Sequence, residues 1–168
     1  VIDEETKKRL IREDPKSEEI IKPWLRGRDI HRWTYDFEKL YLLFTRRGID
    51  IELYPAVKGH LERFKEDLTP KTSKDQKKGR KPGPYKWYEI QDSITYYEAF
   101  EQPKIVYAGM AQKPAFTLDF NSHYSNDKTF IIGYEDYYLL SILNSKITYY
   151  YIKLTCQKLL GDTYELKY

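Results

Sequence analysis

The sequence has few of the residues from which most catalytic and metal sites are built. It contains one cysteine, Cys156, and three histidines among 168 residues. A single cysteine excludes an internal disulfide, which fits a reducing compartment, and the cytoplasm is the expected location. His31, His60 and His123 are scattered and share no metal-ligand spacing with Cys156. We therefore expect no metal site.

Several functional motifs are also missing. No stretch approaches the roughly 18 consecutive apolar residues of a membrane span, so no membrane partner is expected. The glycine-rich phosphate loops, G-x-x-x-x-G-K-S/T and G-x-G-x-x-G, are absent, as is the G-x-S-x-G nucleophile elbow. Cys156 lies in an apolar helical stretch, which favours a core position over a nucleophile. The chain is expected to hold no catalytic residue and no cofactor of its own.

Positive charge is concentrated in one segment. The whole chain has a formal charge of +3, yet residues 71–86 contain seven basic side chains and a single acidic one, Asp75. The rest of the chain is therefore net negative. Because a local patch of charge attracts polyanions more effectively than a high total, this basic segment predicts a polyanionic partner.

The basic segment has two interpretations. In the first, its cations contact the phosphates of a polyanion, held by the stiff Pro82 and Pro84 and by anchoring rings at Tyr85 and Trp87. The expected phosphate contacts are Lys74, Lys77, Lys78, Arg80, Lys81 and Lys86. In the second, the segment is a solvated tether, because Lys-, Gly- and Pro-rich stretches bury little apolar surface.

Apolar periodicity predicts a mixed fold. Strands are expected at residues 38–44, 104–108, 115–120 and 129–133. A helix is expected at 3–14, another at 54–68 with Pro55 in its first turn, and a third, bent or split in two, from about 135 to a stop at Gly161. Strands and helices do not alternate regularly. The predicted class is α+β: one mixed domain with a small, mainly antiparallel sheet flanked by helices and a C-terminal helical segment.

The N-terminal residues 1–17 are charged and offer little apolar surface beyond Leu10 and Ile11. We expect them to form a linker or helix from an upstream domain, with the main domain at residues 18–168. The chain is thus expected to be a piece of a longer protein.

Four ordered segments together resemble a known family. They are IIKPWLRGRDIHRW from Ile20, LYLLFTRRGIDIELYPAVKGHLERFKEDL from Leu40, KWYEIQDSITYYEAFEQPKIVYAGMA from Lys86 and LLSILNSKITYYYI from Leu139. Their order and spacing are similar to those of the TaqI-like C-terminal specificity domain, from about Ile20 to about Leu160. LLSILNSK also resembles the helical closing segment of type I restriction specificity subunits.

The resemblance implies a role in DNA target recognition. In such enzymes an upstream domain binds S-adenosylmethionine and flips the target adenine, because the exocyclic amine cannot be reached inside the base stack. The implied partners are double-stranded DNA and that upstream methyltransferase domain. The family's catalytic Asn-Pro-Pro-Tyr is absent here, since Asn121, Asn126 and Asn144 precede Ser, Asp and Ser. The chain is expected to be non-catalytic by itself, within a bacterial adenine-specific methyltransferase or a fused type II restriction enzyme.

Base reading requires side chains with paired donors and acceptors. The polar loop between the last two predicted strands supplies several, as does a second position nearby, so the candidates are Asn121, Ser122, His123, Tyr124, Asn126, Gln112 and Lys113. An ordinary polar hairpin loop is the alternative. Arg26 and Arg28 flank Trp24 and are further candidates for backbone contact, although a salt bridge from this arginine group to Asp29 or Glu38 is equally compatible with the sequence.

Two other functions stay open. An aromatic-rich surface is also typical of a protein interaction module, for which the lysines would be a solvated tether. An endonuclease fragment is the third possibility, although no Pro-Asp followed by a spaced Glu-x-Lys is present.

Overall fold

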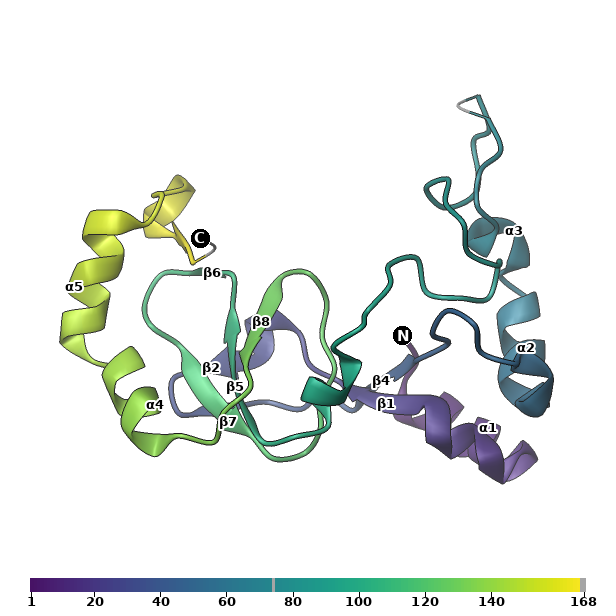
Figure 1. Cartoon of the computed structure of the whole chain (residues 1–168), viewed down its shortest axis with the longest axis horizontal. Helices are drawn as coiled ribbons and strands as arrows, with labels where there is room; N and C mark the ends of the chain where they lie inside the picture. Colours follow the sequence, from purple (N-terminus) through teal and green to yellow (C-terminus); the bar gives the residue numbers. More distant parts are fainter. Residues whose placement is uncertain (74, 167–168) are drawn as a thin grey trace. The chain divides into compact units, whose positions relative to one another are not determined.

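A computed structural model describes residues 1–73 and 75–166 of the chain. These residues form two compact units. Unit 1 comprises Val1–Lys22 and Tyr41–Thr95, and unit 2 comprises Pro23–Leu40 and the residues from Tyr96 onward. The mixture of helices with small antiparallel sheets (Figure 1) confirms the predicted α+β class. The predicted division between residues 17 and 18 stays a prediction.

Unit 1 is mostly helical. Its elements are α1 (Glu4–Glu13), the 3-10 helices η1 (Pro15–Ile20) and η3 (Ile51–Leu53), α2 (Pro55–Glu62) and α3 (Lys65–Leu68). The chain passes between the units within β1 (Ile21–Trp24), at the start of β4 (Leu40–Leu43) and again after Thr95. β1 and β4 pair with each other. Asp3 caps α1 by accepting a hydrogen bond from Thr6 N, and Leu10 is fully buried against the rest of the unit.

The predicted helix at 54–68 breaks into α2 and α3. Pro55 occupies the first turn of α2 as expected, and Val57 is fully buried. Phe64, within the predicted helix, instead has non-helical backbone angles and is 49% exposed. Because a short helix depends on the packing of its apolar face, the uncovered second half does not continue the first.

Unit 2 is built on a three-stranded antiparallel sheet. Its order is β7 (Phe116–Asp119), β5 (Lys104–Ala108) and β8 (Thr129–Ile132), which confirms three predicted strands. Successive residues of the central strand β5 face opposite sides. Ile105 packs with Leu140, whereas Val106 packs with Leu25 and Ile30. The remaining elements of this half of the unit are η2 (Gly27–Asp29), β2 (Ile30–His31), β3 (Thr34–Tyr35) and η4 (Tyr97–Phe100).

The C-terminal segment forms two helices, α4 (Tyr137–Leu143) and α5 (Lys146–Thr155), beside the sheet (Figure 1). Asp136 caps α4 and Ser145 caps α5, so the break between them is encoded locally. The predicted stop at Gly161 is wrong, because α5 ends at Thr155. Gly161 lies in η5 (Leu160–Asp162). The strand that follows, β9 (Tyr164–Glu165), pairs antiparallel with β6 (Met110–Ala111).

The turn after α5 explains this early end. Leu159 N donates to Thr163 O at 2.7 Å, and Glu165 N donates to Gln157 O at 3.0 Å. These main-chain bonds replace those that a continued helix would make. Within the residues that the structure describes, no helix is both long and apolar enough to cross a membrane.

Candidate functional site

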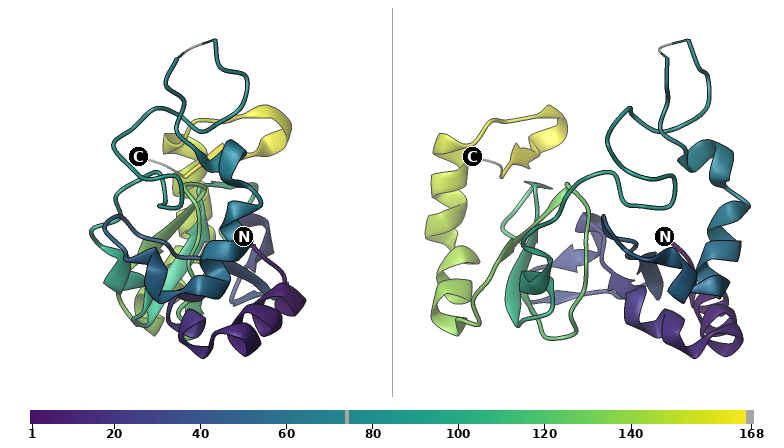
Figure 2. Two further views of the ribbon diagram at one scale, coloured as in Figure 1. Left: turned by 90° about the vertical axis from the view of Figure 1, so that its right-hand side faces the viewer. Right: turned by 45° about the vertical axis from the view of Figure 1, so that its right-hand side comes forward.

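The basic segment of unit 1 forms a loop whose base is closed by main-chain hydrogen bonds. Lys71 N donates to Arg80 O at 2.9 Å, and Arg80 N donates to Thr69 O at 3.1 Å. Gly79 has a φ of +108°, and a Cβ at this position would lie 2.6 Å from Thr69 O. Only glycine fits such a left-handed, crowded position. The loop extends beyond the end of α3 in both views of Figure 2.

Arg80 supports this loop from the inside. Its Nε donates to Leu68 O at 2.6 Å and its Nη2 donates to Trp87 O at 2.9 Å. The guanidinium also lies over the ring of Tyr85, 4.6 Å from the ring centroid, and Tyr85 is buried. The anchoring role expected for Tyr85 therefore agrees with its position. Nε and Nη2 of Arg80 thus donate to backbone carbonyls, which gives the residue a supporting role in the loop. Its contact with phosphate stays a prediction.

Replacing Arg80 by Lys keeps the charge but removes the fork that reaches two carbonyls at once. We expect trypsin to cleave after Lys77 and Lys78 several-fold faster in this variant, since the base of the loop opens more often. Limited proteolysis followed by mass spectrometry measures this. The control is Lys81→Arg, an exchange of the same kind at an exposed position, and equal cleavage in both variants would contradict the assigned role.

Of the other basic residues of the segment, Lys71 is half-buried and Lys74 lies outside the described residues, whereas the rest are exposed: Lys77, Lys78, Lys81 and Lys86. Lys78 pairs with Glu66 at 2.8 Å, between two side chains that are both mostly exposed, so this pair contributes little to stability. Lys86 lies 5.6 Å from the ring centroid of Tyr88. Among the described residues, Lys77 and Lys81 make no ion pair. These two remain the cations of the segment most available to a polyanion.

Glu89 fixes the chain that follows the basic segment. It is buried, and its two carboxylate oxygens accept from Gly48 N at 2.9 Å and Lys86 N at 2.8 Å. Ile90 N also donates to Thr45 O at 2.8 Å. Trp87 is half-buried, and Lys65 Nζ lies 5.1 Å from its ring centroid. The basic segment is thus held at both ends, which disagrees with a freely solvated tether.

In unit 2, Arg26 and Arg28 differ in their surroundings. Arg26 makes a bidentate contact with Asp29, with Nε at 2.7 Å and Nη2 at 2.8 Å from the two carboxylate oxygens. The hydrogen bond that Arg26 donates to Asp29 raises the pKa of Arg26. The salt bridge to Asp29 is therefore present at Arg26, and contact of Arg26 with the DNA backbone stays a prediction. Arg28 is exposed beside a hollow of about 300 Å³ lined by Gly27, Arg28, Ala108, Met110, Asn126 and Lys128.

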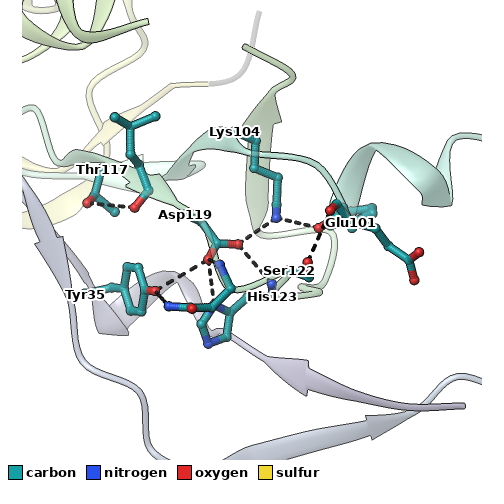
Figure 3. Close-up of polar contacts among 10 residues, drawn as sticks. Tyr35, Glu101, Lys104, Thr117, Asp119, Ser122 and His123 are labelled. Atoms are coloured by element: carbon teal, nitrogen blue, oxygen red, sulfur yellow. Dashed lines mark hydrogen bonds and ion pairs between the residues drawn. The ribbon is translucent and has the colours of Figure 1, made fainter. Parts of the chain in front are cut away.

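The polar loop after β7 is organised by Asp119, which is fully buried (Figure 3). Its carboxylate accepts from Lys104 Nζ at 2.6 Å and from His123 Nδ1 at 2.8 Å. It also accepts from the backbone nitrogens of Asn121 and His123, both at 2.9 Å. Burial alone would raise the pKa of Asp119, but the hydrogen bonds from His123 and Lys104 outweigh burial and hold it well below its usual range.

Lys104 is also fully buried, and Phe100 O accepts a second bond from its ammonium at 2.6 Å. Burial lowers the pKa of Lys104, and the hydrogen bond and charge of Asp119 act in the opposite direction. The two residues are direct partners in the β5–β7 pairing. The ion pair therefore sits where two antiparallel strands bring their ends together.

His123 and Tyr124 were predicted to read bases, and the structure corrects both. His123 is 3% exposed, with its ring against Tyr35 and Phe37 at centroid distances of 5.0 and 4.7 Å. Tyr124 is 1% exposed and stacks on Phe100. A polar side chain can face inward when it finds a hydrogen-bond partner there, and His123 finds one in the buried carboxylate of Asp119.

The other base-reading candidates are wholly or partly accessible to solvent. Asn121, Asn126, Gln112 and Lys113 are exposed, and Ser122 is half-buried. Gln112 Nε2 donates to Gly161 O at 3.2 Å, and Asn126 Oδ1 accepts from Lys128 N at 3.1 Å. Asn121 Nδ2 donates to the hydroxyl of Tyr35 at 2.7 Å. Their role in base reading stays a prediction.

Sequence reasoning missed the residues that support this loop. Lys104 and Asp119 looked like ordinary strand-end charges, and Tyr35 looked like one of many tyrosines. The signal that could have identified them is the hairpin register, because a lysine that begins one strand and an aspartate that ends its antiparallel neighbour lie opposite each other. Among the described residues, no group of three or more His, Cys, Asp or Glu side chains is placed to hold a metal ion.

Comparison with known proteins gives one clear result. Residues 22–168 match the model of the TaqI-like C-terminal specificity domain. A comparison with curated proteins gave no match. The matched range covers most of unit 1 and all of unit 2, including the basic segment, the buried Lys104–Asp119 pair and the polar loop. The chain belongs to the family of TaqI-like C-terminal specificity domains.

Proposed function

We propose that this chain is the DNA target-recognition domain of an adenine-specific DNA methyltransferase or of a fused type II restriction–modification enzyme. The family match over residues 22–168 is the observation that carries this proposal. The chain itself supplies recognition and no catalysis. The S-adenosylmethionine site and the reaction on adenine belong to an upstream methyltransferase domain in this proposal.

Two features of the structure support a DNA partner. Lys77 and Lys81 are exposed on a loop whose base is closed by main-chain hydrogen bonds, so little order has to be gained when the loop docks on phosphates. In unit 2, Asn121 is exposed next to a rigid buried network and offers a polar group that can contact a base edge. Lysines would hold the DNA without reading sequence, while the amide would contribute to discrimination.

The proposal is tested by titrating the full chain with duplex DNA at several salt concentrations. Each phosphate that a lysine neutralises adds about 0.9 to the slope of log K against log salt concentration. We expect the Lys77→Ala, Lys81→Ala double variant to bind more weakly and to lose about 1 to 2 of this slope.

The matched control for this titration is Lys8→Ala with Lys16→Ala, which removes the same charge from exposed positions in α1 and η1. It is expected to bind with nearly the wild-type slope. Binding without salt dependence, or an equal loss in both double variants, would contradict DNA contact by the basic segment.

A second candidate function, contact with another protein surface, is favoured by the C-terminal helix. Ile147, Tyr150, Tyr151 and Leu154 are 63–81% exposed and follow the three- and four-residue spacing of one helical face. Ile152, on another face of α5, is buried in unit 2. We propose that the exposed face docks the methyltransferase domain, which makes this contact complementary to DNA recognition.

A further inference from the structure

The buried carboxylate of Asp119 can only accept hydrogen bonds. It is fully buried, it is paired with the Lys104 ammonium at 2.6 Å, and these contacts keep it ionised. One of its oxygens, Oδ1, lies 3.5 Å from the hydroxyl oxygen of Tyr35, a long hydrogen bond. This oxygen faces the phenol as a fixed negative charge.

The hydroxyl of Tyr35 has two polar neighbours, Asp119 and Asn121, and it donates to one and accepts from the other. Burial raises the pKa of Tyr35, and the charge of Asp119 adds to this effect. Together they outweigh the hydrogen bond from Asn121, which acts in the opposite direction, so the phenol keeps its proton. The proton turns toward the carboxylate, because the carboxylate cannot donate. The phenol oxygen is then left to accept, and its second neighbour is the side-chain amide of Asn121 at 2.7 Å.

The orientation of the Asn121 amide follows from this relay. Only the NH2 end can donate to a phenol oxygen that is accepting, so Nδ2 faces Tyr35 and Oδ1 faces away. The backbone of Asn121 is held too, since its N–H donates to Asp119 at 2.9 Å, and the next residue, Ser122, adopts a left-handed φ of 54°. Asn121 is exposed, and within the described residues its Oδ1 has no hydrogen-bond partner.

We propose that Asn121 Oδ1 accepts a hydrogen bond from the exocyclic amino group of adenine or cytosine in the major groove, and that Asp119 and Tyr35 are positioning residues that fix this polarity. The inference rests on the proposed function. In the major groove, adenine N6 and cytosine N4 are the donors that such an acceptor fits, whereas guanine O6 and thymine O4 are acceptors that it disfavours.

The experiment begins by selecting preferred duplexes from a randomised pool with the full chain. In the selected duplex, each adenine is then replaced in turn by purine, and each cytosine by 2-pyrimidinone, so that single amino groups are removed. At one position we expect the loss of the amine to weaken wild-type binding about tenfold. The same replacement is expected to change binding by the Asn121→Ala variant less than twofold.

Tyr35→Phe tests the positioning role. Without the hydroxyl, the Asn121 amide is free to turn, so we expect the penalty for the missing amine to fall from about tenfold to about two- to threefold. The salt slope should stay at its wild-type value, because no phosphate contact changes. The matched control is Tyr134→Phe, an exposed tyrosine of the same unit, which should keep the full penalty.

Equal penalties for wild type and Asn121→Ala at every position would overturn the inference, as would a Tyr35→Phe variant that discriminates like wild type. In both cases salt-dependent binding by the chain would leave the proposed function intact. A chain that binds no duplex in a salt-dependent manner would remove the proposed function together with this inference. Thermal unfolding of each variant, monitored by circular dichroism, verifies that the compared proteins are folded.

Discussion

Replacing Asp119 by Asn is expected to destabilise unit 2 by about 3–5 kcal/mol, because it leaves the Lys104 ammonium buried without a counter-charge. The measurement is urea unfolding followed by tryptophan fluorescence. In a Trp87→Phe background both remaining tryptophans, Trp24 and Trp33, lie in unit 2 and report on it. The matched control is Asp127→Asn, whose side chain is 80% exposed and which should change stability by less than about 0.5 kcal/mol.

The double variant Lys104→Met, Asp119→Asn removes both charges and should recover part of the loss. Acid should have a related effect on the wild type. The pKa of Asp119 is depressed in the folded state, so its contribution is present above the ordinary carboxyl pKa of about 4 and is lost as the pH falls through the folded value. The stability difference between wild type and Asp119→Asn should therefore shrink below about pH 4. A difference below about 1 kcal/mol at neutral pH would contradict the structural role of the pair.

Replacing Asn144 by Ala is expected to cost about 2–3 kcal/mol. The side chain is buried between α4 and α5 and contacts both backbone groups of Phe116 on β7, with Oδ1 3.1 Å from Phe116 N and Nδ2 2.9 Å from Phe116 O. Alanine would leave Phe116 N buried without an acceptor. The same fluorescence assay measures this, with Ser141→Ala on the exposed side of α4 as the control. If both variants unfold at the same urea concentration, Asn144 does not hold the helices to the sheet.

The strands of unit 2 could be predicted because apolar runs mark buried strands directly. The apolar run from Lys104 to Ala108 forms the central strand of the sheet, and the runs that include Phe116 and Thr129 form its two neighbouring strands. The helix predicted to continue through Phe64 failed, since periodicity alone does not say whether anything covers the apolar face. The expected stop at Gly161 failed because pairing farther along the chain ended α5 six residues earlier.

The candidate site was less accessible to sequence reasoning than the fold. Residue type identified Asn121 and the exposed lysines as candidates for DNA contact. It could not separate them from His123 and Tyr124, which have similar chemistry but are buried. Nor could it separate Arg80 from the lysines around it, since its role depends on the positions of two distant carbonyl groups. The direction in which a side chain points and the partner to which it hydrogen-bonds are set by the folded chain. These two properties decide which polar groups are accessible.

The closed base of the basic loop has a consequence for how this surface can vary between relatives. The base of the loop is fixed by the hydrogen bonds between Thr69, Lys71 and Arg80 and by Gly79. A change in the length or sequence of the loop tip therefore leaves the structure at the base unchanged. Doubling the length of such a loop adds only about 0.6 kcal/mol of closure entropy. Insertions or deletions there can change the number of cations offered to a partner while the scaffold beneath keeps its packing, so affinity can drift independently of stability.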